Sequence, residues 1–298
     1  MITIMTPGQN AWKDEQMARR AGGMGAGTLA VALSLLVSGM CWHTPAVMAS
    51  PPSAPPFGSE LRGPLKGHTR GITALAIGER SDGTRVIVSA GFDKTLRMWS
   101  LDTGKLIGKP WWGHYSGVMD IEVTKRADGS PVFVTGSTDA RMRIWNLDTR
   151  EPIGKPLNAC STCMVYGMAI AKRGDGQRVV ISAEVPDLPL AEGSPPASLR
   201  IRSLESGRPL GEPLTHEGNA HHPFVVTTKD GDGTPVIVSG GTDHNVVVRN
   251  LDTGRPLSGP FTGHTDNISA LAVGAREDGT PVVVSGSLDT TIRIWSLA

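Results

Sequence analysis

Two cysteines are the first side chains in this sequence whose spacing suggests chemistry. Cys160 and Cys163 stand three residues apart, which suits a local disulfide or half of a metal site. Structural zinc normally takes four ligands, and the sequence holds no second cysteine pair. A mixed site that also uses the histidines of segment 216–222 stays open as an alternative. We expect the disulfide, because the N-terminal segment described below predicts export, and free buried thiols are the other alternative. We expect no metal and no cofactor.

A pair of carboxylates is the second group that could do chemistry. Asp120 and Glu122 stand two residues apart, so in a strand they would share one face. We expect ion pairing with Lys125 or Arg126, and a site for a cation or a polar ligand is the alternative. The sequence contains no HExxH or GxSxG motif and no glycine-rich phosphate loop. One carboxylate pair and one histidine-rich loop are too few groups for a catalytic mechanism.

Repetition in the sequence shows which elements must position these side chains. The stretch 282–297, VVVSGSLDTTIRIWSL, has the pattern of a strand, an Asp-bearing turn and a second strand. Close copies lie at 86–101 and 132–147, a weaker copy at 236–251, and a broken one from 179 to 204. Five Asp-Gly pairs typical of hairpin turns precede these second strands, with glycines 46, 47, 57 and 46 residues apart. The long step contains an insertion at 186–196. Such a period indicates a repeat architecture.

The repeat resembles a known family. Its order of Gly-His, Asp-Gly, Ser-Gly-Ser-x-Asp and Ile-Arg-Ile-Trp is similar to the WD40 repeat, especially that of bacterial proteins, over about residues 61–298. The match is specific in repeats one, two and five and rests on spacing in repeats three and four. The resemblance implies an all-β fold, a β-propeller of four-stranded antiparallel blades. Because the last repeat stops after its third strand, we expect residues 61–65 (LRGPL) to close a ring of five blades.

The resemblance also implies a hydrogen-bonded network in each complete repeat. In the family a histidine, a hydroxyl, the turn aspartate and the tryptophan bind one another. The three implied sets are His68, Ser89, Asp93 and Trp99; His114, Thr135, Asp139 and Trp145; and His264, Ser285, Asp289 and Trp295. Each set looks like a catalytic triad, but threefold recurrence favours a structural role. Repeats three and four place Arg202 and Arg249 at the tryptophan position, so we expect these blades to be less stable and to open first.

Aligning the repeats separates core aromatics from exposed ones. Trp111 takes a position that is apolar in every repeat, which indicates the core. Trp112 and Tyr115 take positions that are polar elsewhere, so we expect both to be exposed. Exposed aromatic side chains are typical of binding hot spots, and packing on the next blade is the alternative. Trp112, Tyr115, Asp120 and Glu122 are therefore the candidate partner-binding residues.

The first sixty residues differ from the repeats in composition. Arg19 and Arg20 precede an apolar core at 28–40, which is short for a membrane span and suits a signal peptide. Segment 46–49 (AVMA) offers small residues for cleavage. We expect a signal peptide or membrane anchor at 1–49, a Pro- and Ser-rich linker at 50–60, and the propeller at 61–298. This organisation predicts a location outside the cytoplasm.

These observations together predict a scaffold. The formal net charge of +1 gives no electrostatic basis for binding nucleic acid. We expect a non-catalytic, monomeric protein that binds an unidentified protein partner and is secreted or tethered to a membrane through residues 28–40. One alternative is a ligand- or sugar-binding propeller, or an enzyme, that uses the central channel. Another is a cytosolic scaffold with a misassigned start.

Overall fold

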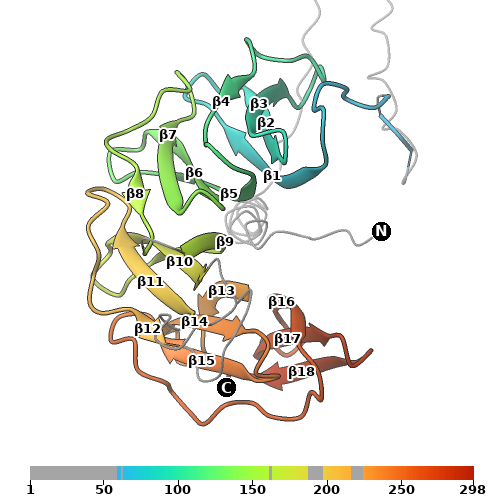
Figure 1. The fold of residues 1–298 in the computed structure, drawn as a ribbon. Coiled ribbons are helices and arrows are strands. Elements are labelled where there is room, and N and C mark those ends of the chain that lie inside the picture. The colour runs from blue at the N-terminus through green and yellow to red at the C-terminus, as the bar shows by residue number, and fades with distance from the viewer. Residues whose placement is uncertain (1–58, 62, 161–162, 187–196, 216–223) are drawn as a thin grey trace, which may run out of the picture.

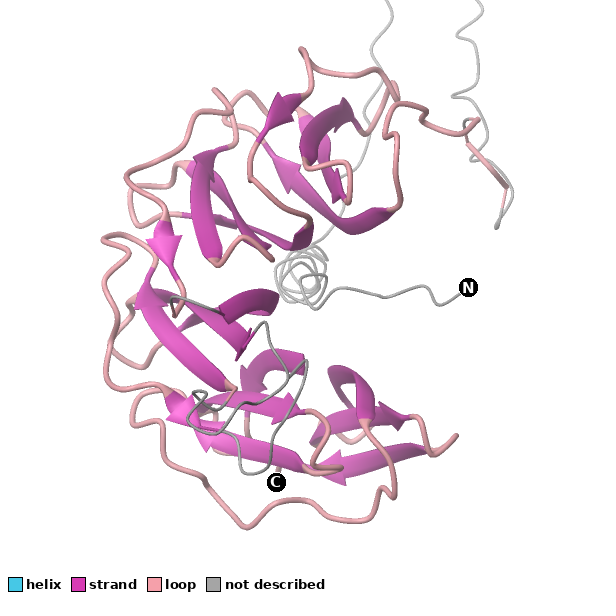
Figure 2. Cartoon of the chain, in the orientation of Figure 1, coloured by secondary structure: helices cyan, strands magenta, loops and turns pink. Residues whose placement is uncertain are grey.

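The computed structural model describes residues 59–61, 63–160, 163–186, 197–215 and 224–298, which form strands and turns (Figure 1, Figure 2). The described strands form five antiparallel sheets, and each sheet contains one sequence repeat. The expected all-β fold of propeller blades is confirmed. The predicted signal or anchor at 1–49, with its apolar core at 28–40, lies outside the described residues. Within the described ranges, no helix has the length and hydropathy to cross a membrane.

The sheets are named blades one to five in chain order. The described strands are β1 (Ile72–Glu79), β2 (Arg85–Gly91), β3 (Thr95–Ser100) and β4 (Trp111–Trp112) in blade one; β5 (Val118–Lys125), β6 (Pro131–Ser137), β7 (Arg141–Asn146) and β8 (Leu157–Asn158) in blade two; β9 (Cys163–Lys172), β10 (Arg178–Pro186), β11 (Ser198–Ser203) and β12 (Leu214–Thr215) in blade three; β13 (Phe224–Lys229), β14 (Pro235–Gly240) and β15 (Val246–Asn250) in blade four; and β16 (Ile268–Ala275), β17 (Pro281–Ser287) and β18 (Ile292–Ser296) in blade five.

The blades follow one another along an arc. The first strands of neighbouring blades contact each other in the order β1, β5, β9, β13 and β16 and line the inside of the arc (Figure 1). Each later strand of a blade lies farther from the inside than the one before it. The chain therefore builds each blade from the inside outward and then returns to start the next.

The Asp-Gly pairs form the turns between the first and second strands of each blade. Their glycines have φ between 80° and 86°, a region that strains a residue with a Cβ atom. In each turn the glycine N–H donates to the carbonyl three residues earlier, as Gly83 does to Arg80 at 3.0 Å. The hairpin turns predicted from these pairs are confirmed.

Apolar side chains fill each of the four joints between neighbouring blades. At the first joint, Leu96 and Met98 of β3 pack in one buried cluster with Ile121 of β5. At the second, Met142 of β7 packs with Met168 of β9. Burying one such side chain contributes about 1.5–3 kcal/mol. The joints, rather than any single sheet, hold the molecule together.

A charged clamp crosses the edge of the first three joints. In each clamp an arginine of an Asp-Gly turn binds an acidic residue that follows the third strand of the next blade; the pairs are Arg80 with Asp148, Arg126 with Glu205, and Arg173 with Asp252. Arg126 Nε donates to Glu205 Oε2 at 2.8 Å, and the Ala127 N–H donates to Oε1 at 2.8 Å. The clamp fixes the distance and orientation between neighbouring blades.

The fourth joint replaces the clamp with backbone contact. Asp230 of blade four stands at the position of the clamp arginines. Ala298 of blade five stands at the position of the clamp acids. The Gly231 N–H donates instead to the carbonyl of Leu297 at 2.9 Å. The arginine and the acid are thus both absent from the fourth joint, as expected if the two residues act only as a pair across a joint.

The predicted closure of the ring by residues 61–65 is wrong. Among the described residues there is no strand before β1, and the sheet of blade five ends at β18. His68 and Thr69 bind Asp93 of blade one, and blade one lies at the opposite end of the arc from β18 (Figure 1). Because residues 63–65 come just before this anchor, they lie with blade one and not beside β18, and the described blades form an open arc (Figure 1).

The prediction of four strands in every blade holds for three blades. In blade four the fourth strand is reduced to one bridge, in which Phe261 and Val246 exchange backbone hydrogen bonds of 2.8 and 3.2 Å. Blade five has three described strands.

Candidate binding surface

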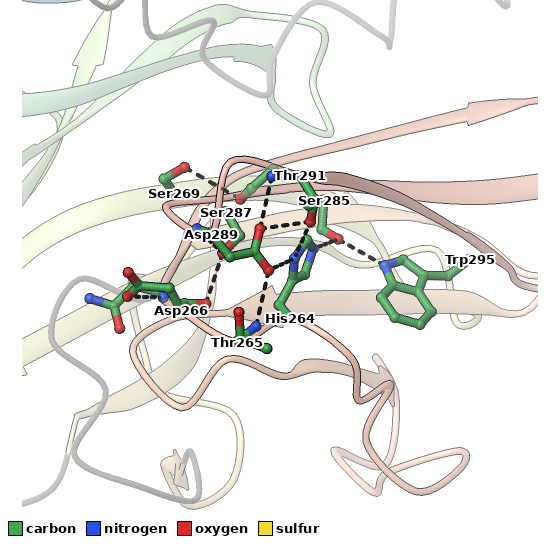
Figure 3. Close-up of polar contacts among 11 residues, drawn as sticks. His264, Thr265, Asp266, Ser269, Ser285, Ser287, Asp289, Thr291 and Trp295 are labelled. Carbon is green, nitrogen blue, oxygen red and sulfur yellow. Dashed lines mark hydrogen bonds and ion pairs between the residues drawn. The ribbon is translucent and has the colours of Figure 1, made fainter.

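The polar network of blade five joins side chains from three different segments (Figure 3). His264, which precedes β16, contacts Asp289 through Nδ1 at 2.8 Å and Ser285 through Nε2 at 2.9 Å. Trp295 Nε1 donates to the same Ser285 hydroxyl at 2.8 Å. The Thr265 N–H donates to Asp289 at 3.0 Å, which ties the loop before β16 to the turn before β18.

Blades one and two repeat this arrangement. In both, the histidine contacts the turn aspartate through Nδ1 and the strand hydroxyl through Nε2, and the tryptophan donates to that hydroxyl. The contacts are His68 with Asp93 at 2.9 Å and Ser89 at 2.8 Å, Trp99 with Ser89 at 2.9 Å, His114 with Asp139 at 3.1 Å and Thr135 at 2.7 Å, and Trp145 with Thr135 at 2.9 Å. The structure thus brings together all four members of each of the three sets.

Burial determines what these networks can do. Ser89, Thr135 and Ser285 are all buried, and their oxygens already accept a hydrogen bond from an indole N–H. A neutral histidine that donates from Nδ1 to the aspartate leaves Nε2 to accept the hydroxyl proton, which satisfies every group. A substrate carbonyl has no access to such a hydroxyl. The geometry supports a structural role for the networks.

The turn aspartates of the networks stay ionised at acidic pH. Burial raises the pKa of Asp93, but hydrogen bonds from Thr69, Thr95 and His68 outweigh burial and lower its pKa to about 2. The pKa values of Asp139 and Asp289 are lowered for the same reason, again against burial. The contribution of Asp93 to stability is complete above the unfolded pKa of 3.8 and is lost as the pH falls through about 2.

Blade three builds a different network around the same strand position. Ser182 corresponds to the network hydroxyls, and Arg202 takes the place of tryptophan. Arg202 donates to Ser182 Oγ at 2.9 Å and to Glu184 Oε1 at 2.7 Å. Its second NH2 group donates to the Asn158 carbonyl of blade two at 2.8 Å. A buried ion pair therefore replaces the tryptophan and histidine, which weakens the argument that blade three is less stable.

Blade four also places an arginine, Arg249, at the tryptophan position. Arg249 donates to the carbonyl of Thr215 in blade three at 2.9 Å and to that of Gly254 at 3.4 Å. The turn aspartate Asp243 accepts from the Asn245 N–H at 3.4 Å. These contacts are longer or more exposed than those of the other blades. That blade four opens first stays a prediction.

Two aromatic side chains project from the junction of blades one and two. Trp111 and Trp112 alternate along β4, so Trp111 packs edge-on against Phe133 and Trp145, while Trp112 is 74% exposed. Tyr115 is also 74% exposed. Its N–H donates to Asp139 at 2.9 Å, and the Arg141 guanidinium lies 5.4 Å from its ring centre. The network of blade two thus fixes the backbone that presents Tyr115.

Phe92 adds a third aromatic residue that the sequence analysis missed. It stands in the turn between β2 and β3, is half-exposed, and lies close to Gly117 of the loop that carries Tyr115. The strand that follows this turn, β3, pairs with β4 through Thr95 and Trp112. A signal was available, because the matching turn positions are Thr138 and Thr242 in repeats two and four. We call Phe92, Trp112 and Tyr115 the aromatic surface.

The two candidate carboxylates lie inside the molecule and not on the aromatic surface. Asp120 and Glu122 are both buried. Asp120 accepts from the Met168 N–H of blade three at 2.6 Å and from the Ile121 N–H at 2.8 Å. Asp120 therefore helps to join blades two and three, and its burial argues against contact with a protein partner. The predicted pairing with Arg126 is wrong, because Arg126 binds Glu205 in the clamp.

Burial raises the pKa of both carboxyl groups. For Asp120 the two backbone N–H donors partly oppose this rise. Glu122 lacks that help: its Oε1 atom is buried without a hydrogen-bond partner, and repulsion from Asp120 raises its pKa further, well above the usual value. One of the two groups therefore holds a proton well above the pH at which an exposed carboxyl would lose it.

Cys160 and Cys163 form the expected disulfide, with Cα atoms 5.0 Å apart. The bond closes the short loop that leads into β9. The histidines of segment 216–222 lie outside the described residues, as does the insertion from 187 onward. Among the residues that the structure does describe, no group of three or more metal-ligating side chains could hold an ion.

Comparison with known families gives one match on two segments. The family is WD40 (WD domain, G-beta repeat), and the matched residues are 59–100 and 255–296. These segments contain two of the complete networks, from His68 to Trp99 and from His264 to Trp295. Residues 59–100 and 255–296, in blades one and five, are therefore WD40 repeats. WD40 repeats build propeller blades that serve as protein-interaction scaffolds, and this chain has the five repeated blades. A search of curated proteins found no match to the chain.

Proposed function

We propose that this chain is a non-catalytic scaffold that binds a protein partner through the aromatic surface. The observation that carries the proposal is the exposure of Trp112 and Tyr115, 74% for each, with the Arg141 guanidinium over the Tyr115 ring. Tryptophan, tyrosine and arginine are the residues most enriched at binding hot spots. Large aromatic groups that face solvent in a well-packed blade have no role in that blade's own core.

The rigidity of the loop supports the same proposal. Asp139 binds both His114 and the N–H of Tyr115, so the backbone of the aromatic surface is fixed before any partner arrives. A fixed backbone lowers the entropy that binding must overcome. The buried hydroxyls of the three networks support the non-catalytic part of the proposal, because a nucleophile must reach its substrate.

We also propose that the protein is exported or held at a membrane. The support is the apolar segment 28–40 after Arg19 and Arg20, together with the small residues at 46–49. Mass spectrometry of the mature protein from its native cells checks this. A mature N-terminus at Ser50 is expected for a cleaved signal, and a retained residue 1 in the membrane fraction for an anchor. Residues 1–49 on a cytosolic protein would contradict the proposal.

The partner is to be sought by affinity capture with the full chain. Capture by the parent is compared with capture by a Trp112→Ala/Tyr115→Ala variant whose thermal unfolding is unchanged. A matched control removes two other exposed apolar side chains, with Leu106→Ala and Leu257→Ala. The expected result is a partner captured by the parent and by the control but lost by the aromatic variant. Equal capture by all three chains would contradict the proposed surface.

A further inference from the structure

The outer face of β18, at one end of the arc, leaves apolar side chains exposed that every other blade buries. Ile292 is 74% exposed and Ile294 is 68% exposed. The matching pairs of blades one to four are all buried, each covered by the next blade; they are Leu96 and Met98, Met142 and Ile144, Leu199 and Ile201, and Val246 and Val248. We call Ile292, Ile294 and the neighbouring turn with Arg276 the tail face.

Strand β1, at the other end of the arc, shows the complementary exposure. Leu75 is 50% exposed, whereas its counterparts are all buried against the preceding blade; they are Ile121, Met168, Val225 and Leu271. Ile72 and Ile77 of the same strand are exposed as well. We call Ile72, Leu75, Ile77 and the turn with Asp102 the head face. Tail and head are thus the two halves of the joint that the chain makes four times.

The charged clamp has the same two halves at the ends of the arc. Arg276 takes the position of the clamp arginines Arg80, Arg126 and Arg173, and it is exposed. Asp102 takes the position of the clamp acids Asp148, Glu205 and Asp252. It is exposed and pairs with Arg85 of its own blade at 2.5 Å. A carboxylate can accept from several donors at once, so the pairing with Arg85 does not prevent Asp102 from binding Arg276 of a second copy.

We infer that the tail face of one copy packs on the head face of a second copy, in a head-to-tail contact with the design of the internal joints. Apolar pairs bury the centre of this contact, and Arg276 of one copy clamps Asp102 of the other. The sequence analysis expected a monomer, but exposed apolar faces of this kind are typical of subunit contacts. Such a contact between unlike faces closes a ring or extends a filament.

A second copy fits the end faces better than the chain's own other end. Head and tail belong to blades at opposite ends of the open arc (Figure 1). Joining them within one chain requires a change at the internal joints, which are close-packed and resist gradual deformation. A second copy presents the head face without any such change.

Sedimentation velocity of the full chain at increasing concentration tests the inference. We expect the parent to associate and Ile294→Lys to weaken association at least about tenfold, because the lysine places a charge at the centre of the contact. Trp112→Lys is the matched control, because Trp112 has equal or greater exposure and lies outside both end faces. It should associate like the parent. Equal weakening by both variants, or a parent that stays monomeric, would overturn the inference.

The clamp allows a second, independent test that does not depend on the exposed apolar side chains. Arg276→Asp and Asp102→Arg should each weaken association about fivefold, and the chain with both changes should recover most of it. Cysteines at positions 102 and 276, placed on separate chains and mixed under a mild oxidant, should give a covalent dimer. The same cysteines on one chain joining only within that chain would overturn the second-copy contact in favour of ring closure.

Discussion

At the scale of single residues, the same strand position serves two different chemistries. The buried hydroxyl accepts from an indole N–H in three blades and from a guanidinium in blade three, where Arg202 also binds the buried Glu184. The position can change donor because a hydroxyl accepts equally from either group. A charged donor then requires a carboxylate, and Glu184 stands where blade two has Ser137.

We predict that Arg202→Ala destabilises the protein by about 3 kcal/mol, because the buried Glu184 carboxylate loses its closest cation and keeps only Arg200 at 3.5 Å and the Ser182 hydroxyl at 2.9 Å. Urea unfolding measures the change. The double variant Arg202→Ala/Glu184→Ala should cost less than the sum of the two single changes. Purely additive effects would show that the pair does not act as a unit.

The buried Glu122 carboxyl gives a pH prediction of opposite sign to that of the turn aspartates. Its raised pKa means that the folded state holds a proton that the unfolded state releases, so stability falls as the pH rises above the unfolded value of 4.5. Glu122→Gln removes this titration. We expect the variant to gain about 1 kcal/mol or more over the parent at pH 8 and little at pH 4.5.

Thermal unfolding across this pH range measures the difference. Asp82→Asn is the control, because Asp82 is an exposed turn carboxylate. It should leave the slope of stability between pH 4.5 and 8 unchanged. A Glu122→Gln variant with the same pH slope as the parent would show that Glu122 is ionised in the folded protein.

At the scale of elements, the joint is the unit that repeats. Each joint combines an apolar cluster with a contact from an Asp-Gly turn to the next blade, and three of the four contacts are clamps of arginine and acid. These contacts lie at the surface, whereas the clusters are buried. The clusters should therefore supply most of the energy, and the clamps should fix the angle between blades.

We predict that Arg173→Ala lowers stability by only about 1 kcal/mol, because the clamp is partly exposed. Its larger effect should be local, with faster hydrogen exchange in the turn at 173–176 and in β15. Exposed Arg255→Ala, which removes an arginine outside the clamp, is the control. Exchange that rises equally across all blades would contradict a local role for the clamp.

The sequence predicted the elements well because their determinants are local. Asp-Gly pairs at fixed spacing set the turns, and aligning the repeats placed Trp111 in the core and Trp112 on the surface. The carboxylates were misjudged for the opposite reason. Whether Asp120 faces a channel or the N–H of Met168 depends on how blade three packs on blade two, and no local pattern contains that information.

At the scale of the whole molecule, the repeats fix each blade but not the closure of the ring. Closure depends on the rotation between blades, which is set by four joints together and is not written in one repeat. The predicted closing strand at 61–65 failed because His68 and Thr69 anchor that region to blade one. In our proposal, the head and tail faces of the open arc serve self-association, and the aromatic surface binds a protein partner.

The most direct test of this account is a binding titration with the captured partner, comparing Trp112→Ala/Tyr115→Ala with Ile294→Lys. The account predicts at least about a tenfold loss of affinity for the aromatic variant and no loss for the end-face variant. Loss of affinity in the end-face variant alone would contradict it, because the partner would then bind the open end of the arc and not the aromatic surface.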